Sequence, residues 1–261
     1  MSTFLLLPPS DFPRPLDFPP PPSARRPGRS PTPPSPAMLP PKSRAAALAL
    51  LLLSHLYVTL ASDDEEPVEI VTYGSTIKLE HVPTGVRLHS HDVSYGSGSG
   101  QQSVTGFHDA GDSNSYWIVK AAHGAARRLA GEPVKCGDWV RLQHLNTGKN
   151  LHSHDHRAPM NADAEVSAYA LQKDGRWFNG DTADNWVLEC VARGAAQWKR
   201  FEHVRFKHQE GGKWLAADAR LKFREPIPGQ LQVSGSSRQN ANTVWKTNEG
   251  FYFAPPKPKS V

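Results

Sequence analysis

The sequence lacks most of the signatures that mark an enzyme. Its 261 residues contain no P-loop, no dinucleotide fingerprint and no nucleophile elbow, and the glycine-rich run 96–100 precedes a strand pattern rather than a helix. We therefore assign no catalytic residue and expect the protein not to be an enzyme. Asn-x-Ser/Thr acceptors are also missing, so N-glycosylation is not expected.

Long hydrophobic runs are scarce as well. One apolar run, residues 45–53, follows Lys42 and Arg44, and the segment ends with a small residue, Ala61. This order is typical of a secretory signal peptide, predicted over residues 38–61, whereas the alternative is a buried helix of the folded domain. No second such run follows, so we predict no membrane span in the mature protein.

The two ends of the chain are rich in proline. Residues 1–37 carry proline runs such as 19–22 and little apolar surface to offset the entropy of ordering. We expect this segment to be disordered, or untranslated with Met38 as the start. Residues 253–261 form a short basic Pro/Lys tail that carries no retrieval signal of the Lys-Asp-Glu-Leu type.

The central feature is an internal repeat. The letters LHSHD occur at residues 88–92 and again at 151–155, and extending them shows three related units of about 60 residues. We place the repeats at about 72–120, 135–191 and 200–249, within a domain at 68–252. In the third copy the letters are LAAD, at 215–218, so only the leucine is present in all three.

Each repeat has the pattern of four strands. Apolar and polar residues alternate with a period of two, and a glycine supplies the positive φ that a short hairpin loop needs. No sustained helical pattern follows the signal peptide, so the fold class is all-β. Three units that cannot bury their apolar faces alone predict a closed β-trefoil with pseudo-threefold symmetry. Its core is expected to contain Leu79, Leu142, Phe206, Trp117, Trp186 and Trp245.

The chain has two cysteines, Cys136 before the first strand of repeat two and Cys190 at the end of its last strand. These strands are antiparallel neighbours in a trefoil unit, so a disulfide is favoured in an oxidising lumen. The alternative is a pair of unpaired buried thiols.

The repeated unit resembles the MIR domain, which occurs in protein O-mannosyltransferases and in inositol trisphosphate and ryanodine receptors. The runs 73–79, 87–92 (RLHSHD) and 95–106 (YGSGSGQQSVTG) are similar to those of stromal cell-derived factor 2-like proteins. That resemblance implies a β-trefoil built from three MIR repeats, and it covers residues 68–252. The third repeat departs from the family, which usually repeats Leu-His-Ser-His there.

The resemblance also implies a function. Family members act in protein folding and quality control in the endoplasmic reticulum, in complex with a DnaJ-type co-chaperone and the lumenal DnaK-type chaperone. Client glycoproteins or receptors are then the further partners. We expect the protein to lie in the lumen, retained by a partner rather than by a retrieval signal.

The histidine pairs raise the question of a metal site. His89 and His91 share one face of a strand, as do His152 and His154. However, zinc needs a third or fourth ligand, and the threefold arrangement of the repeats keeps the two histidine pairs far apart. We favour hydrogen bonding to loop backbone, predict no metal and no cofactor, and place the histidines on an outer or loop-facing side. The predicted partner-binding residues are Arg87, His89, His91, His152, His154, Lys207 and Lys213.

Two other binding modes stay open. The basic segment 199–224 is either an acidic-partner surface or a solvated charged face. The alternative function is a carbohydrate-binding, lectin-like trefoil, in which Tyr169 and Trp177 of the long loop in repeat two stack on a sugar ring. Nucleic acid is not expected as a partner, because a signal peptide directs the chain away from it.

Overall fold

The protein is represented by a computed structural model, which describes residues 68–173, 176–178 and 180–256. The predictions for residues 1–37 and 38–61, and for the last five residues of the basic tail, lie outside these residues. No helix in the described part is long and apolar enough to cross a membrane.

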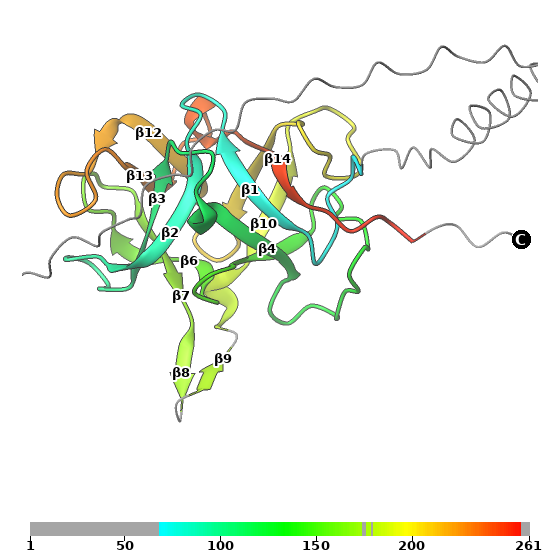
Figure 1. The fold of residues 1–261 in the computed structure, drawn as a ribbon, viewed down its shortest axis with the longest axis horizontal. Coiled ribbons are helices and arrows are strands. Elements are labelled where there is room, and N and C mark those ends of the chain that lie inside the picture. The colour runs from blue at the N-terminus through cyan, green and yellow to red at the C-terminus, as the bar shows by residue number, and fades with distance from the viewer. Residues whose placement is uncertain (1–67, 174–175, 179, 257–261) are drawn as a thin grey trace, which may run out of the picture. The chain divides into compact units, whose positions relative to one another are not determined.

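The three repeats each form four strands in the same order (Figure 1). Repeat one contains β1 (Thr76–His81), β2 (Arg87–Ser94), β3 (Gln102–Phe107) and β4 (Tyr116–Ala121). Repeat two contains β5 (Trp139–His144), β6 (Asn150–Arg157), β7 (Ala164–Tyr169) and β10 (Trp186–Cys190). Repeat three contains β11 (Val204–His208), β12 (Trp214–Lys222), β13 (Leu231–Ser236) and β14 (Trp245–Phe251).

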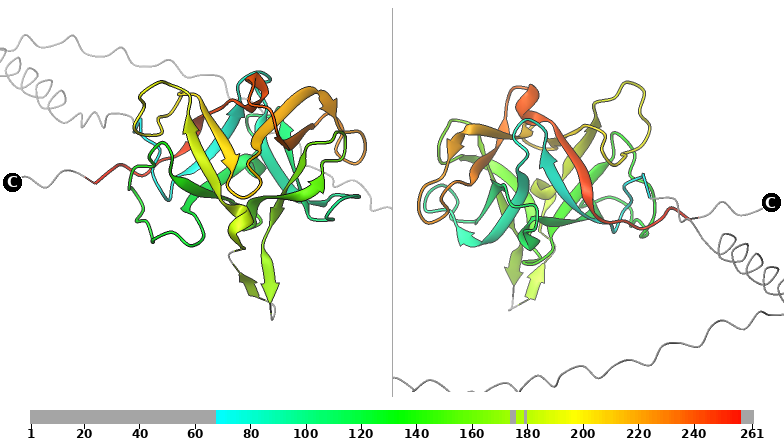
Figure 2. Two further views of the ribbon diagram at one scale, coloured as in Figure 1. Left: turned by 180° about the vertical axis from the view of Figure 1, so that it is seen from behind. Right: turned by 45° about the horizontal axis from the view of Figure 1, so that its top comes forward.

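The first and fourth strands of the repeats close a six-stranded barrel. Their antiparallel pairing runs in a circle, β1–β4–β5–β10–β11–β14 and back to β1. The hairpins β2–β3, β6–β7 and β12–β13 cover one end of this barrel, and their inner strands β3, β7 and β13 pair with one another. Figure 2 shows the barrel and its hairpins from two further directions. The prediction of an all-β trefoil is confirmed.

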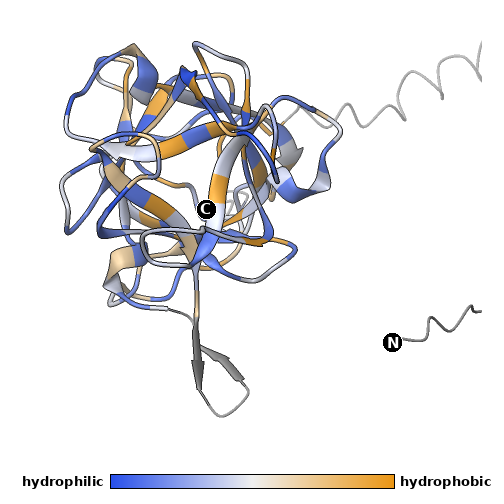
Figure 3. Cartoon of the chain, turned by 90° about the vertical axis from the view of Figure 1, so that its left-hand side faces the viewer, coloured by the Kyte–Doolittle hydropathy of each residue, from blue (hydrophilic) through white to orange (hydrophobic). Residues whose placement is uncertain are grey.

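Alternation of apolar and polar residues places the core inside the barrel. Hydrophobic and hydrophilic residues follow one another along the strands in Figure 3. All six residues predicted for the core are fully buried, namely Leu79, Leu142, Phe206, Trp117, Trp186 and Trp245. The core also contains Trp198, which sequence reasoning missed and whose ring meets Phe206 edge to face at 5.5 Å.

Glycine makes the tight turns after β1, β5 and β11. Gly85, Gly148 and Gly212 have φ of +72°, +70° and +61°, a region that other residues enter only with strain. The disulfide is also confirmed, because Cys136 and Cys190 are bonded with a Cα–Cα distance of 5.5 Å.

Two kinds of element were not predicted. A single turn of 3-10 helix precedes the last strand of each repeat: η1 (Ser113–Ser115), η2 (Thr182–Asp184) and η3 (Ala241–Thr243). In addition, repeat two carries an extra hairpin, β8 (Leu171–Lys173) and β9 (Arg176–Phe178), which projects away from the barrel in Figure 1.

Candidate functional site

One histidine in each repeat bonds the neighbouring repeat. We call His81, His144 and His208 the inter-repeat histidines. Their Nε2 atoms donate to the carbonyl oxygens of Asn242, Asn114 and Ala183, respectively, at 2.8, 2.9 and 2.8 Å. Each acceptor lies in the 3-10 turn of another repeat. Burial lowers the pKa of all three rings, which keeps them neutral inside the protein.

The leucine common to the three repeats has a double structural role. Leu88, Leu151 and Leu215 are fully buried in the core. Their carbonyl oxygens accept hydrogen bonds from the indole Nε1 atoms of Trp117, Trp186 and Trp245 at 2.8, 2.9 and 2.9 Å. An indole N–H inside a core needs such an acceptor, but the backbone of any residue supplies it, so it is the buried side chain that makes leucine a requirement of the fold rather than of a partner.

In repeat one, a carboxylate is bonded to the histidine pair. His89 is only 3% exposed, and its Nδ1 lies 2.7 Å from Oδ2 of Asp112. Its Nε2 lies 2.6 Å from Nδ1 of His91. Burial lowers the pKa of His89, although the bond to Asp112 opposes that shift. Asp112 also caps η1 by accepting from the backbone N–H of Asn114.

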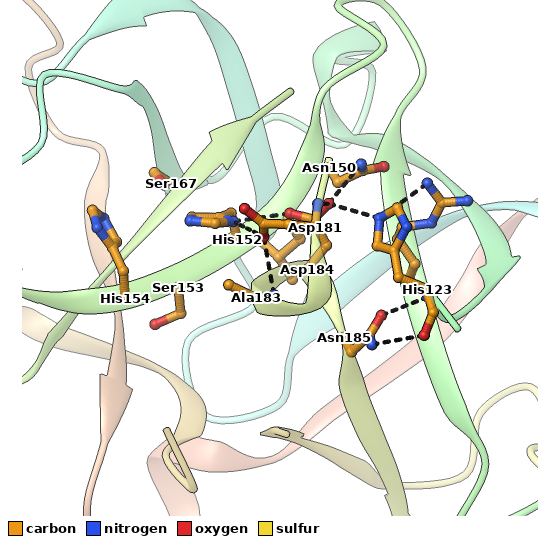
Figure 4. A network of polar contacts seen from close by, with 12 residues as sticks. His123, Asn150, His152, Ser153, His154, Ser167, Asp181, Ala183, Asp184 and Asn185 are labelled. Atoms are coloured by element: carbon orange, nitrogen blue, oxygen red, sulfur yellow. Dashed lines mark hydrogen bonds and ion pairs between the residues drawn. The ribbon is translucent and has the colours of Figure 1, made fainter. Parts of the chain in front are cut away.

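The pair in repeat two follows the same plan with a different carboxylate (Figure 4). His152 is 5% exposed, and its Nδ1 lies 2.9 Å from Oδ1 of Asp184, which is fully buried. The other oxygen of Asp184 lies 2.9 Å from Nδ2 of Asn150 and 3.0 Å from Nε2 of His123. Asp184 therefore sits at the centre of an internal polar network.

The second histidine of that pair bonds a different acid. Nε2 of His154 lies 3.1 Å from Oε1 of Glu165. Burial alone would raise the pKa of Glu165, but hydrogen bonds from His154 and Ser99 outweigh it and lower the pKa. The carboxylate is thus held in its charged form by donors from two different repeats.

These contacts correct the predicted bonding partners of the histidines and decide between the two predicted placements. His89 and His152 lie on a loop-facing side rather than an outer one, because the 3-10 turns cover the face of β2 and β6 on which they stand. Their partners are carboxylates rather than loop backbone. Sequence reasoning gave no role as a histidine partner to Asp112 or to Asp184, the polar residue that stands shortly before Trp186.

The cluster of His152, Asp181 and Asp184 has the composition of a metal site, with one ligand atom from each within 4.8 Å of the others. However, Nδ1 of His152 donates to Asp184, so its electron pair is not directed at a metal. This geometry favours a hydrogen-bond network, and the absence of a metal stays a prediction.

The predicted partner-binding residues divide into two groups. Arg87 is occupied by an ion pair with Glu249 at 2.7 Å and lies on β2 with His89 and His91. His154 and Lys213 come together from repeats two and three, because both line a surface hollow of about 260 Å³ that also contains Glu210. Lys207 lies over the ring of Trp214, 4.7 Å from its centroid.

The two aromatic residues of the carbohydrate hypothesis do not share one loop. Tyr169 ends strand β7, where its ring packs against His152 with centroids 5.1 Å apart. Residue 177 lies in β9 of the projecting hairpin. Stacking of both rings on a single sugar stays a prediction.

Comparison with known proteins agrees with this architecture. The family model of the MIR domain matches residues 94–233. The stromal cell-derived factor 2-like protein of Dictyostelium discoideum is 49% identical over 193 residues, which are 73% of this chain and 87% of that protein.

Solved structures agree as well. The SDF2-like protein from Arabidopsis thaliana is 43% identical, with a TM-score of 0.66 over 72% of this chain and 99% of that one. A protein O-mannosyltransferase complex of S. cerevisiae, bound to the sugar donor, is 27% identical with a TM-score of 0.61, over 75% of this chain but only 28% of that one. With its three repeats, its trefoil and these relatives, the chain belongs to the stromal cell-derived factor 2-like family of MIR-domain proteins.

Proposed function

We propose that this protein is a non-catalytic component of protein folding and quality control in the lumen of the endoplasmic reticulum. In this role it binds a DnaJ-type co-chaperone and, through it, the lumenal DnaK-type chaperone, while client glycoproteins or receptors are the further partners. Membership of the stromal cell-derived factor 2-like family supports the proposal, because family members work in such complexes.

The burial of the histidines is the observation that supports a non-catalytic role. A general base needs a ring nitrogen that reaches a bound substrate. The His89–Asp112 and His152–Asp184 pairs have the geometry of such a base and its orienting acid, yet both rings are at most 5% exposed. Their hydrogen bonds hold the 3-10 turns to the hairpins, which is a structural task.

The surface that fits a protein partner lies where repeats two and three meet. The hollow lined by His154 and Lys213 offers a ring nitrogen, an ammonium group and the carboxylate of Glu210 within one concave area. Lys207 stands nearby on β11, which pairs with the start of β12 beside Lys213. A mixture of charges on a concave rim favours specific recognition of a charged protein surface.

The test is co-purification of the tagged full chain from lumenal extract. Recovery of both a DnaJ-type and a DnaK-type chaperone is expected, and the Lys213→Glu variant recovers less of both because it reverses one charge in the hollow. Arg127→Glu is the matched control, since Arg127 is exposed in the loop after β4 and away from this hollow. Recovery of glycans without any chaperone contradicts the proposal.

Retention gives a second test of the proposed location. If a partner holds the protein in the lumen, depletion of the DnaJ-type co-chaperone releases it into the medium. Quantitative blotting of cells and medium measures the shift. An unchanged distribution after depletion contradicts retention by that partner.

A further inference from the structure

The third repeat differs from the other two at three positions that line one hollow. Ala216 stands where repeats one and two have His89 and His152. Strand pairing places Ser236 opposite Trp214, the position that Phe107 and Tyr169 hold opposite Arg87 and Asn150. The residue that caps the 3-10 turn is Asn240 instead of an aspartate.

In repeats one and two, packed rings fill the first two of these positions. His89 packs against Phe107 with ring centroids 5.1 Å apart, and His152 packs against Tyr169 at the same 5.1 Å. Repeat three has lost both members of this ring pair, and a methyl group and a hydroxymethyl group take their place. When small side chains replace two packed rings and the backbone keeps its course, a cavity is left.

A cavity of about 340 Å³ does lie at this place, within the size range of small-molecule sites. It is formed by β12, β13, η3 and the loop between β6 and β7. Its polar lining includes Asp218, Asn240, Asn242, Ser236, Asn161 and Asp163. Carboxylates accept hydrogen bonds, while amides and hydroxyl groups both donate and accept.

The acceptors in this cavity are held in position. Arg220 donates two hydrogen bonds to Asp218, from Nε to Oδ1 at 3.0 Å and from a terminal nitrogen to Oδ2 at 2.6 Å. These bonds lower the pKa of Asp218 to about 2, so it is a charged acceptor at neutral pH. Asp163 accepts from Nδ2 of Asn161 at 2.9 Å and from the hydroxyl of Ser234 at 3.1 Å.

We propose that this cavity in the third repeat binds one hexose-sized sugar unit. Neighbouring hydroxyl groups on a pyranose ring need acceptors and donors side by side, which the carboxylates, amides and hydroxyls supply. The methyl group of Ala216 provides a small apolar area for a C–H face of the sugar. The two carboxylates are matched by Arg220 and Arg238 in the same lining, so the cavity has no excess charge that would favour an ionic ligand over a neutral one.

The proposal is independent of the chaperone role, and it differs from stacking on Tyr169 and Trp177. It predicts a single site per chain, because the ring pairs of repeats one and two fill the corresponding space. A protein client that carries a glycan would then meet this face of the trefoil through its sugar.

The test is saturation-transfer difference NMR on the full chain with the methyl glycosides of mannose, glucose, galactose and N-acetylglucosamine. Transfer to at least one of them is expected. Ala216→His abolishes it, because the ring refills the cavity as His89 and His152 do in the other repeats. Asp218→Asn weakens the affinity at least about tenfold through loss of a charged acceptor.

Ala126→His is the matched control, since Ala126 is exposed in the loop after β4, and it retains the signal. Unchanged urea unfolding curves show that the variants are folded. Absence of transfer from all four glycosides at millimolar concentration overturns the proposal. Transfer that survives Ala216→His overturns it too, because the sugar then binds elsewhere.

Discussion

Acidification should destabilise this protein steeply. The cause is the set of inter-repeat histidines, His81, His144 and His208, whose pKa values burial lowers below the ordinary value of 6.5. In the unfolded chain these rings take up protons at their ordinary pKa, while in the folded protein they resist protonation. The folded state therefore binds fewer protons, and stability is lost as the pH falls through about 6.5.

The size of the effect follows from the number of rings. A histidine that stays neutral in the folded state contributes a slope of up to about 1.4 kcal/mol per pH unit below 6.5. Three equivalent rings give a limit of about 4 kcal/mol per pH unit, a large share of a typical domain stability of about 5–15 kcal/mol. His89 and His91, whose pKa values burial also lowers, add to the slope in the same direction.

Neighbouring carboxylates oppose the shift without reversing it. Asp218 raises the pKa of His81 and Asp112 raises that of His144, but burial is the larger influence on both rings. The slope therefore falls short of the limit while keeping its sign.

The assay is urea unfolding followed by tryptophan fluorescence at pH values from 7.5 to 5. The His144→Asn variant should lose stability at every pH and also show a shallower slope, by up to about 1.4 kcal/mol per pH unit. His108→Asn is the control, since His108 is exposed after β3 and is not one of the inter-repeat histidines. A free energy of unfolding that stays constant between pH 7.5 and 5, or an identical slope for His144→Asn, refutes the reasoning.

Three further outcomes are expected. Leu151→Ala should cost about 2–5 kcal/mol in urea unfolding, because the side chain is fully buried, and a cost below about 1 kcal/mol would contradict its core role. Replacing Cys136 and Cys190 with serine should cost about 4 kcal/mol, since the bond closes a loop with a sequence separation of 54, and an unchanged Tm would argue against this. Chelator should leave the Tm unchanged and added zinc should not raise it, whereas a zinc-dependent rise would assign a metal to the His152–Asp184 network.

The fold was largely predictable from the sequence because its signals are local and repeated. Period-two alternation located the strands, glycines located the tight turns, and the threefold repeat of leucine and tryptophan required a shared core. A trefoil is one of few ways in which three such units bury their apolar faces without exposed strand edges. The extra hairpin in repeat two escaped prediction because nothing repeats it in the other two units.

The surroundings of the histidines were not predictable, and the reason is physical. Alternation assigns residues i and i+2 to one face of a strand but does not say what covers that face. On β2, Leu88, His89 and Ser90 are all buried, because the core packs on one side and η1 packs on the other. In the sequence, a single capping side chain is the only mark of the 3-10 turn. The face of the strand that the turn covers is therefore known only from the structure.

The cavity of repeat three was hidden for a similar reason. The change from LHSHD to LAAD was evident in the sequence, and it showed that the fold does not need the histidines. The second half of the change is Ser236, which is opposite Trp214 only through strand pairing. Neither substitution alone indicates an open space.

The inter-repeat histidines connect the repeats in a circle, whereas the peptide chain connects them in a line. Repeat one bonds repeat three through His81 and the carbonyl of Asn242, just as the covalently adjacent repeats bond each other through His144 and His208. The junction between the first and last repeats is thus held by the same contact as the two junctions that the backbone crosses. Circularly permuted chains that start at repeat two or three would keep every one of these contacts, so the position of the chain ends is incidental to the integrity of the fold.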